Sequence, residues 1–216
     1  MKKIAAIFLS IIVLFTANTY ATAAQESSLL DIQHRWAEAN YQLGGDSKIK
    51  AFNRLRDDID ALLTANPDDA NLLIWRGITQ STLAGVKKGL GALSLAKQAK
   101  QDLESAMAIN DKALEGSAYT SLGTLYHKVP GWPVGFGNDK KARQMLMSAL
   151  SINPDGIDPN YFFGEYLYDK GEYSEARKYL QVAKHAAPRP ARPVADEGRQ
   201  HEIELLLKQV EKKLVD

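Results

Sequence analysis

The sequence predicts an all-α protein built as a solenoid of repeated helix pairs, and two observations lead to this prediction. The first is a fixed spacing of apolar residues and a closing turn residue, which occurs at Ala176, Leu180, Ala183 and Pro188, at Ala142, Leu146, Ala149 and Pro154, at Ala99, Leu103, Ala106 and Asp111, and more weakly at Leu55, Ile59, Leu62 and Pro67. The second is a glycine ahead of three of these copies, at Gly77, Gly123 and Gly164. Unrelated amphipathic helices would not preserve linked offsets, so we expect repeats that pack in register.

Residues 1–23 are expected to be a secretory signal peptide. Lys2 and Lys3 precede an apolar run over residues 4–15, and Ala21-Thr22-Ala23 is a small-x-small cleavage site. The apolar run is shorter than the roughly 20 residues that a membrane-spanning helix needs. We therefore predict that residues 24–216 form a single mature domain in the periplasm, with no membrane insertion after signal cleavage.

The composition of the mature chain narrows the classes of partner. Cleavage removes two lysines and leaves 27 − 2 = 25 basic against 26 acidic side chains, a balance that does not favour nucleic acid as a partner. The chain contains no cysteine, which excludes disulfides and a lipid-modified cysteine at the cleavage site. The stability of the protein must therefore come from helix stacking.

The mature chain begins with a degenerate repeat over residues 28–67. We expect one helix over residues 28–43, a stop at Gly44-Gly45-Asp46, and a partner helix over residues 48–65 before the turn at Asn66-Pro67. Terminal repeats deviate from the common pattern because one of their faces meets water.

Three fuller repeats follow over residues 70–111, 116–154 and 157–188. In the last of them, Asp158 and Pro159 open the first helix and Gly171 ends it. Its pattern resembles the tetratricopeptide (TPR) signature of about 34 residues, through Asn160-x2-Phe163-Gly164-x2-Leu167 followed by Ala176-x3-Leu180 and Pro188. This resemblance implies a right-handed helical solenoid in which the first helix of each pair lines a concave face.

A proline-rich connector over residues 188–193 separates the repeats from a predicted capping helix at residues 195–214. Proline lacks a backbone donor, so the connector cannot be helical. The capping helix is indicated by apolar residues at helical spacing, namely Ile203, Leu206, Leu207, Val210 and Leu214. Three arginines near the connector could form an anion site, but a solvated connector is the favoured interpretation of Arg189, Arg192 and Arg199.

Two of the repeats contain insertions between their helices. The glycine precedes the alanine by 12 residues in the last repeat (164 to 176), by 19 in the middle one (123 to 142) and by 22 in the first (77 to 99). The extra residues fall at 85–94, where the glycines lack the phosphate-loop pattern, and at 129–137. Trp132 and Phe136 stand among glycines and prolines in the second insertion, so they either pack back onto the helices as a lid or contact a ligand.

Several blocks resemble the T-component proteins of TRAP-type solute uptake systems: GLGALSLAK (residues 89–97), YTSLGTLYHKVPGWPVGFG (119–137), GIDPNYFFGEYL (156–167) and the ending APRPARPVADEGRQ. The resemblance covers most of residues 70–205. It implies an exported helical protein that works beside a solute-binding protein and a membrane permease, with room for an apolar ligand, and it brings no catalytic residues.

These patterns favour a non-catalytic periplasmic TPR interaction protein, as an accessory component of a TRAP-type system, whose partner is another periplasmic protein such as a solute-binding protein. The alternative is a periplasmic carrier for an apolar or carboxylated small molecule. We expect no enzyme, metal or cofactor, because the four histidines stand in separate predicted helices and a cysteine nucleophile is missing. The candidate binding residues, where the insertions meet the concave face, are His127, Trp132, Phe136, Tyr161, Glu165 and Tyr168.

Overall fold

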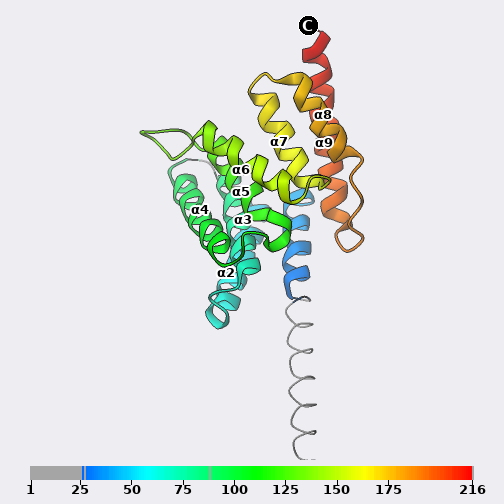
Figure 1. The fold of residues 1–216 in the computed structure, drawn as a ribbon. Coiled ribbons are helices and arrows are strands. Elements are labelled where there is room, and N and C mark those ends of the chain that lie inside the picture. The colour runs from blue at the N-terminus through cyan, green and yellow to red at the C-terminus, as the bar shows by residue number, and fades with distance from the viewer. Residues whose placement is uncertain (1–25, 27, 88, 216) are drawn as a thin grey trace, which may run out of the picture.

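The computed structural model describes residues 26, 28–87 and 89–215, and within them helices alternate with short connections (Figure 1). The predicted signal peptide lies outside the described residues. An N-terminal helix over residues 28–41 is followed by α2 (Gly45–Ala65), α3 (Ala70–Lys87), α4 (Leu90–Asn110), a short 3-10 turn (Ala113–Gly116), α5 (Ser117–Lys128), α6 (Asp139–Ile152), α7 (Ile157–Asp169), α8 (Tyr173–Lys184) and α9 (Pro193–Val215).

The helices pack as successive pairs, which confirms the predicted all-α, TPR-type solenoid with a C-terminal capping helix. Helix α3 packs against α4, α5 against α6, and α7 against α8. The first helices of the pairs also contact one another, α3 with α5 and α5 with α7, and so form a continuous inner layer. Helix α9 closes the array by packing on α8 and α7 (Figure 1).

The glycines mark the points at which the paired helices cross. A Cβ added to Gly77 would lie 2.8 Å from Cγ of Leu103, and one added to Gly123 would lie 2.6 Å from Cγ of Leu146. In the last pair, a Cβ on Gly164 would come within 2.7 Å of Leu180. Because glycine lacks this atom, the two helices approach closely enough to bury the leucine, as the repeated spacing predicts.

The first predicted insertion, residues 85–94, is mostly helical. Helix α3 continues to Lys87 and α4 already begins at Leu90, so this repeat contains a longer helix pair rather than a binding loop. The reason is that apolar residues continue at helical spacing on both sides of the turn and pack on the core, including Val86 and Ala92. Gly89, with φ of +72°, adopts the left-handed backbone that the tight reversal requires.

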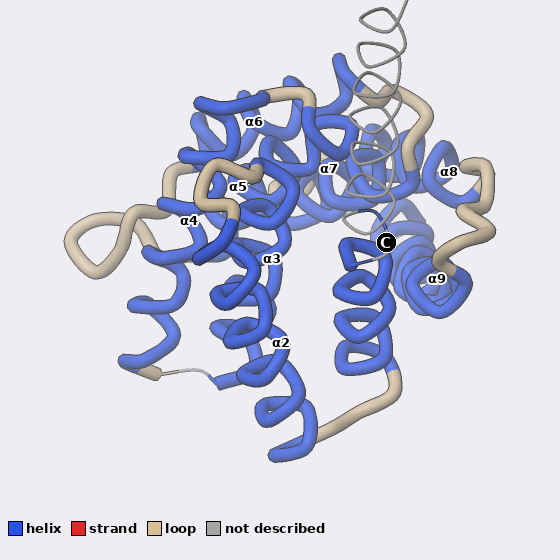
Figure 2. The backbone as a smooth tube through the Cα atoms, turned by 90° about the horizontal axis from the view of Figure 1, so that it is seen from below, coloured by secondary structure: helices blue, strands red, loops and turns tan. Residues whose placement is uncertain are grey.

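The N-terminal helix meets the connector and the first turns of α9. A Cβ on Gly198, in α9, would collide with the ring of Tyr41 at the end of the N-terminal helix. The Tyr41 hydroxyl donates a hydrogen bond to Glu202 (3.3 Å), and His34 Nε2 lies 2.5 Å from the carbonyl oxygen of Ala191. The N-terminal helix therefore lies against both the connector and α9 (Figure 2). Among the described residues no helix has the length and apolar character that crossing a membrane requires.

Candidate functional site

The loop between α5 and α6, residues 129–138, has a closed backbone. The N–H of Asn138 donates to the carbonyl oxygen of Tyr126 (2.8 Å), and the N–H of Gly137 donates to that of Pro130 (2.9 Å). A Cβ at Gly137 would collide with the carbonyl oxygen of Val129, so only glycine at this position allows the beginning and the end of the loop to approach each other. Hydrogen bonds and sterics together hold the loop in one shape.

The two aromatic residues of this loop have opposite environments. Trp132 is 90% exposed at the loop tip, and Val134 beside it is 66% exposed. Phe136 instead packs edge to face on Tyr126, with ring centroids 5.8 Å apart, and Lys100 Nζ lies 6.0 Å from its centroid. Phe136 thus fastens the loop to the helices, while Trp132 projects into solvent.

The loop lies against the start of α4. A Cβ on Gly135 would be in van der Waals contact with Cδ1 of Leu93, at 3.4 Å. The loop and the α3–α4 turn therefore share one edge of the solenoid, where the ribbon of the loop projects beyond the helices (Figure 1). We call this surface, made by residues 89–93 and 129–137, the loop edge.

His127 and Glu165 belong to a charged cluster between α5 and α7. His127 Nε2 lies 2.8 Å from Asp169, and Lys128 Nζ contacts both Asp169 (2.8 Å) and Glu165 (3.2 Å). Partial burial raises the pKa of Asp169, but hydrogen bonds from Lys128 and His127 outweigh it, so this pKa lies below its usual value. The cluster links the two inner helices, and its groups largely satisfy one another.

The two candidate tyrosines pack within the protein. Tyr161 is 8% exposed and lies under the guanidinium of Arg199, whose Cζ is 4.3 Å from the ring centroid. Burial raises the pKa of the Tyr161 hydroxyl above its usual range. Tyr168 packs against Tyr173 at the start of α8, with ring centroids 5.6 Å apart. The six predicted site residues therefore fall into three places: the loop edge, the α5–α7 cluster, and the packing around α7.

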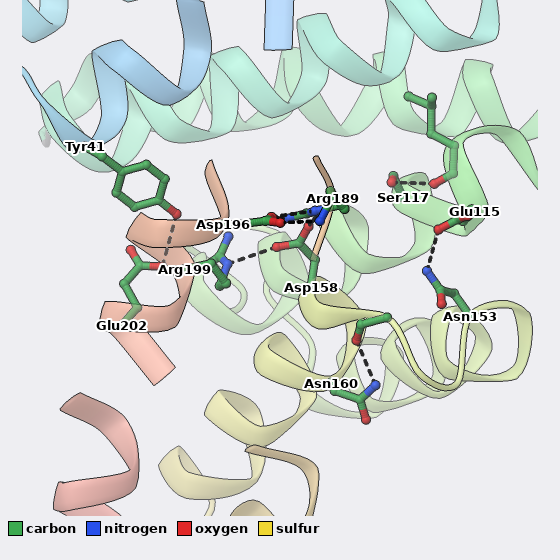
Figure 3. A network of polar contacts seen from close by, with 12 residues as sticks. Tyr41, Glu115, Ser117, Asn153, Asp158, Asn160, Arg189, Asp196, Arg199 and Glu202 are labelled. Atoms are coloured by element: carbon green, nitrogen blue, oxygen red, sulfur yellow. Dashed lines mark hydrogen bonds and ion pairs between the residues drawn. The ribbon is translucent and has the colours of Figure 1, made fainter. Parts of the chain in front are cut away.

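An ion network fastens the connector to the inner layer (Figure 3). Asp158, at the start of α7, lies 2.6 Å from Arg189 Nη1 and 2.9 Å from Arg199 Nε. Arg189 also pairs with Asp196 (2.6 Å), and Arg199 with Glu202 (2.6 Å). Burial raises the pKa of Asp158, but the charges of Arg199 and Arg189 outweigh it and hold this pKa below its usual range.

The favoured interpretation of the arginines as part of a solvated connector is therefore wrong for Arg189 and Arg199, although the prolines of the connector are themselves exposed. Arg199 is 7% exposed, and Arg189 is partly buried by its carboxylate partners. The connector and the first turns of α9 cover the part of the concave face formed by Asp158 and Tyr161. The sequence signal for this network is a set of arginines in a proline-rich segment together with Asp158. Asp158 does not cap α7, because the helix begins at Ile157 with Gly156 as its N-cap.

Two shallow grooves lie on other surfaces. One, of about 650 Å³, is lined by α6 and includes Met147 and Tyr166; the other, of about 380 Å³, is polar and includes Arg76 and Gln80. Within the described part of the chain, no cluster of three or more histidine, aspartate or glutamate side chains could hold a metal ion.

Comparisons with known proteins gave matches among solved structures alone. No family model matches the sequence, and a search of curated proteins found no match. A crystal structure of MamA is similar with a TM-score of 0.46 and 19% identity, covering 76% of this chain and 89% of that one. A second structure of the MamA protein has a TM-score of 0.42 and 18% identity, covering 87% of this chain and 90% of that one.

Proposed function

We propose that this chain is a non-catalytic helical-repeat protein that binds a partner protein through the loop edge, with Trp132 at the centre of the contact. The observation that carries this proposal is the 90% exposure of Trp132 on a loop whose backbone is closed by hydrogen bonds and glycine. A large aromatic ring that is already held in place loses little entropy on binding and offers much apolar area. Such residues dominate the energetics of many interfaces.

The loop edge is favoured over the concave face because the protein covers part of that face itself. Arg199 packs over Tyr161, and Asp158 is engaged by two arginines. A ligand would have to displace these contacts to reach Tyr161. This packing favours a protein partner over the alternative of a carrier with its ligand at Tyr161.

We further propose that the protein works in the periplasm as an accessory of a TRAP-type uptake system, with a solute-binding protein as its partner. The signal-peptide pattern of residues 1–23 and the resemblance of the loop blocks support this assignment. Cell fractionation with N-terminal sequencing of the mature chain tests the location. A chain that keeps residues 1–23 in the cytoplasm would contradict the proposal.

The partner is best sought with a photo-crosslinking amino acid at position 134, because Val134 is 66% exposed beside Trp132 and its replacement leaves the Trp132 ring in place. The captured protein is then purified, and its dissociation constant is measured for the wild type and three variants. Trp132→Ala should weaken binding about 30-fold, equivalent to about 2 kcal/mol. Gly137→Ala retains Trp132 but cannot keep the loop shape, and it should also weaken binding.

Met147→Ala is the matched control, since Met147 is 55% exposed on α6 and lies outside the loop edge. Trp132→Ala and Met147→Ala should both keep the wild-type melting temperature, because neither residue is buried. Equal partner affinity in Trp132→Ala, Met147→Ala and the wild type would reject the loop edge as the binding surface.

A further inference from the structure

The loop edge itself carries no charge. Residues 89–93 and 129–137 contain no lysine, arginine, histidine, aspartate or glutamate. The exposed tip, residues 130–134, has the sequence Pro-Gly-Trp-Pro-Val, so it offers a partner mainly apolar contacts. Any recognition of charge at this surface must therefore come from the helices that frame it, which are α3, α4, α5 and α6.

The acids of these four helices are engaged within the protein. Helix α4 contains Asp102 and Glu104, whose carboxylates lie 2.6 Å from an arginine and 2.7 Å from a lysine, respectively. Asp139 in α6 lies 2.6 Å from Lys170, and the sequences of α3 and α5 contain no acid. The frame of the loop edge therefore has no carboxylate left for another cation.

Four exposed lysines of the same helices have no such partner. In the part of the chain that the structure describes, no side-chain hydrogen bond or ion pair is found for Lys87, Lys97, Lys140 and Lys141. The first ends α3, the second lies in α4, and the last two lie in the first turn of α6. We call these four residues the lysine rim. It gives the surroundings of the loop edge an excess of unpaired positive charge.

Lys141 lies at the base of the loop, on the α6 side. Its Nζ is 5.3 Å from the ring centroid of Tyr126, and Phe136 packs edge to face on the same ring. The lysine therefore stands beside the aromatic pair that fastens the loop to the helices.

Lys97 lies on the α4 side of the same loop. Residues at positions 93, 97 and 100 are neighbours on one face of a helix, because they are separated by four and three residues. Leu93 and Lys100 on that face both border the loop. Lys97 and Lys141 therefore flank the base of the loop from two helices, while the apolar tip projects between them and a partner.

We propose that the partner protein presents acidic side chains around an apolar pocket for Trp132, and that Lys97 and Lys141 pair with these acids. This inference rests on the proposed function and adds the chemistry of the partner. Complementary charges speed the encounter of two proteins and fix their relative orientation. The apolar tip then supplies most of the affinity, and the lysine rim supplies the rate of association.

An acidic protein surface fits the charge pattern better than an anionic lipid surface does. Glu104 and Asp139 lie on the same helices as the rim lysines, with side chains 48% and 63% exposed. A layer of anionic lipid headgroups is negative throughout and would repel both carboxylates. A protein can place a polar or basic group opposite each of them and acids opposite the lysines.

The test measures the binding kinetics of the full mature chain with the purified protein captured from position 134, at about 50 and about 500 mM sodium chloride. Lys97→Gln/Lys141→Gln should lower the association rate constant about tenfold at the lower salt concentration. Its dissociation rate constant should change by less than about threefold, because charges at the rim of an interface mainly steer the encounter. Salt should slow the association of the wild type far more than that of this double variant.

Lys208→Gln/Lys212→Gln is the matched control, because it removes the same charge from exposed positions on α9, a helix that packs on α7 and α8. It should keep the wild-type rate constants. Both double variants should also keep the wild-type melting temperature, since the substituted lysines are exposed. Trp132→Ala should instead raise the dissociation rate constant, because it removes the apolar anchor.

The outcomes separate this inference from the proposed function. Weakened binding of Trp132→Ala, together with equal association rates of the two lysine double variants, would refute the acidic partner and leave the loop edge as the binding surface. Wild-type affinity of Trp132→Ala, or the capture of no protein from position 134, would reject the proposed function and this inference with it.

A lipid arm completes the test. The mature chain is centrifuged with vesicles of phosphatidylglycerol and phosphatidylethanolamine at about 150 mM salt. The wild type should stay in the supernatant. Sedimentation of the wild type, lost in Lys97→Gln/Lys141→Gln but kept in Lys208→Gln/Lys212→Gln, would assign the lysine rim to lipid headgroups and overturn the proposal.

Discussion

Replacing Asp158 by alanine tests how firmly the connector is attached to the inner layer. In this variant Arg189 keeps Asp196 and Arg199 keeps Glu202, but both guanidiniums lose the carboxylate between them. Removing one partner of a buried ion pair typically costs about 3–5 kcal/mol. The Asp158 side chain is 31% exposed and both arginines retain an acid, so we expect a smaller loss of folding free energy. We place it at about 2 kcal/mol.

The assay is thermal unfolding followed by circular dichroism. A loss of about 2 kcal/mol should lower the melting temperature by roughly 4–8 °C in a protein of this size. Glu211→Ala is the control, because the pair of Glu211 with Arg177 spans 3.6 Å between half-exposed side chains. Such surface pairs contribute little, so its shift should stay within about 2 °C. A melting temperature of Asp158→Ala that equals the wild-type value would refute the assigned role of the network.

The same residue gives a prediction for pH. Because the folded-state pKa of Asp158 lies below its unfolded value of about 4, its contribution to stability is fully present above that value. The contribution is lost as the pH falls through the folded-state pKa. Wild-type protein should therefore lose stability more steeply than Asp158→Asn as the pH is lowered from about 5. Parallel urea-unfolding midpoints across this range would contradict the assigned charge interaction.

Two further predictions concern the packing and the loop. Gly123→Ala should lower the unfolding free energy by about 1–3 kcal/mol in urea melts, because its Cβ would meet Leu146. Gly91→Ala is the control and should be neutral or stabilising, because there is open space around Gly91. Equal effects of the two substitutions would argue against the close helix crossing. Acrylamide should quench the fluorescence of Trp132 and leave the two buried indoles, so Trp132→Phe should remove most of the quenchable signal; unchanged quenching would place the ring inside the fold.

The fold could be predicted because its determinants repeat along the chain. Each crossing needs a glycine on one helix and a leucine on the next, and these residues occur at fixed offsets. The spacing of Gly164 and Leu180 in the sequence therefore predicts which two residues meet at the helix crossing. The loop at 129–137 was also predictable, since its glycines and prolines exclude a helix.

The environment of the connector could not be predicted in the same way. Arg199 pairs with Asp158, which lies 41 residues away in the sequence, and no local spacing predicts an ion pair over that separation. Trp132 posed a different problem: a ring among glycines fits a lid as well as an exposed contact. Only the position of the loop tip relative to the helices distinguishes these cases, and Phe136 in the same loop has the opposite environment.

The contact between Tyr41 and Gly198 changes how the N-terminal unit of the repeat array is held in place. In an open stack, a terminal unit has a neighbour on one side only, so its local unfolding breaks a single interface. Here the N-terminal helix also contacts the connector and the first turns of α9, so it has a second packing interface besides the one with its neighbours in sequence. Unfolding the N-terminal helix would therefore break this second interface as well, and a chain with an inserted or deleted repeat would lose the contact between Tyr41 and Gly198.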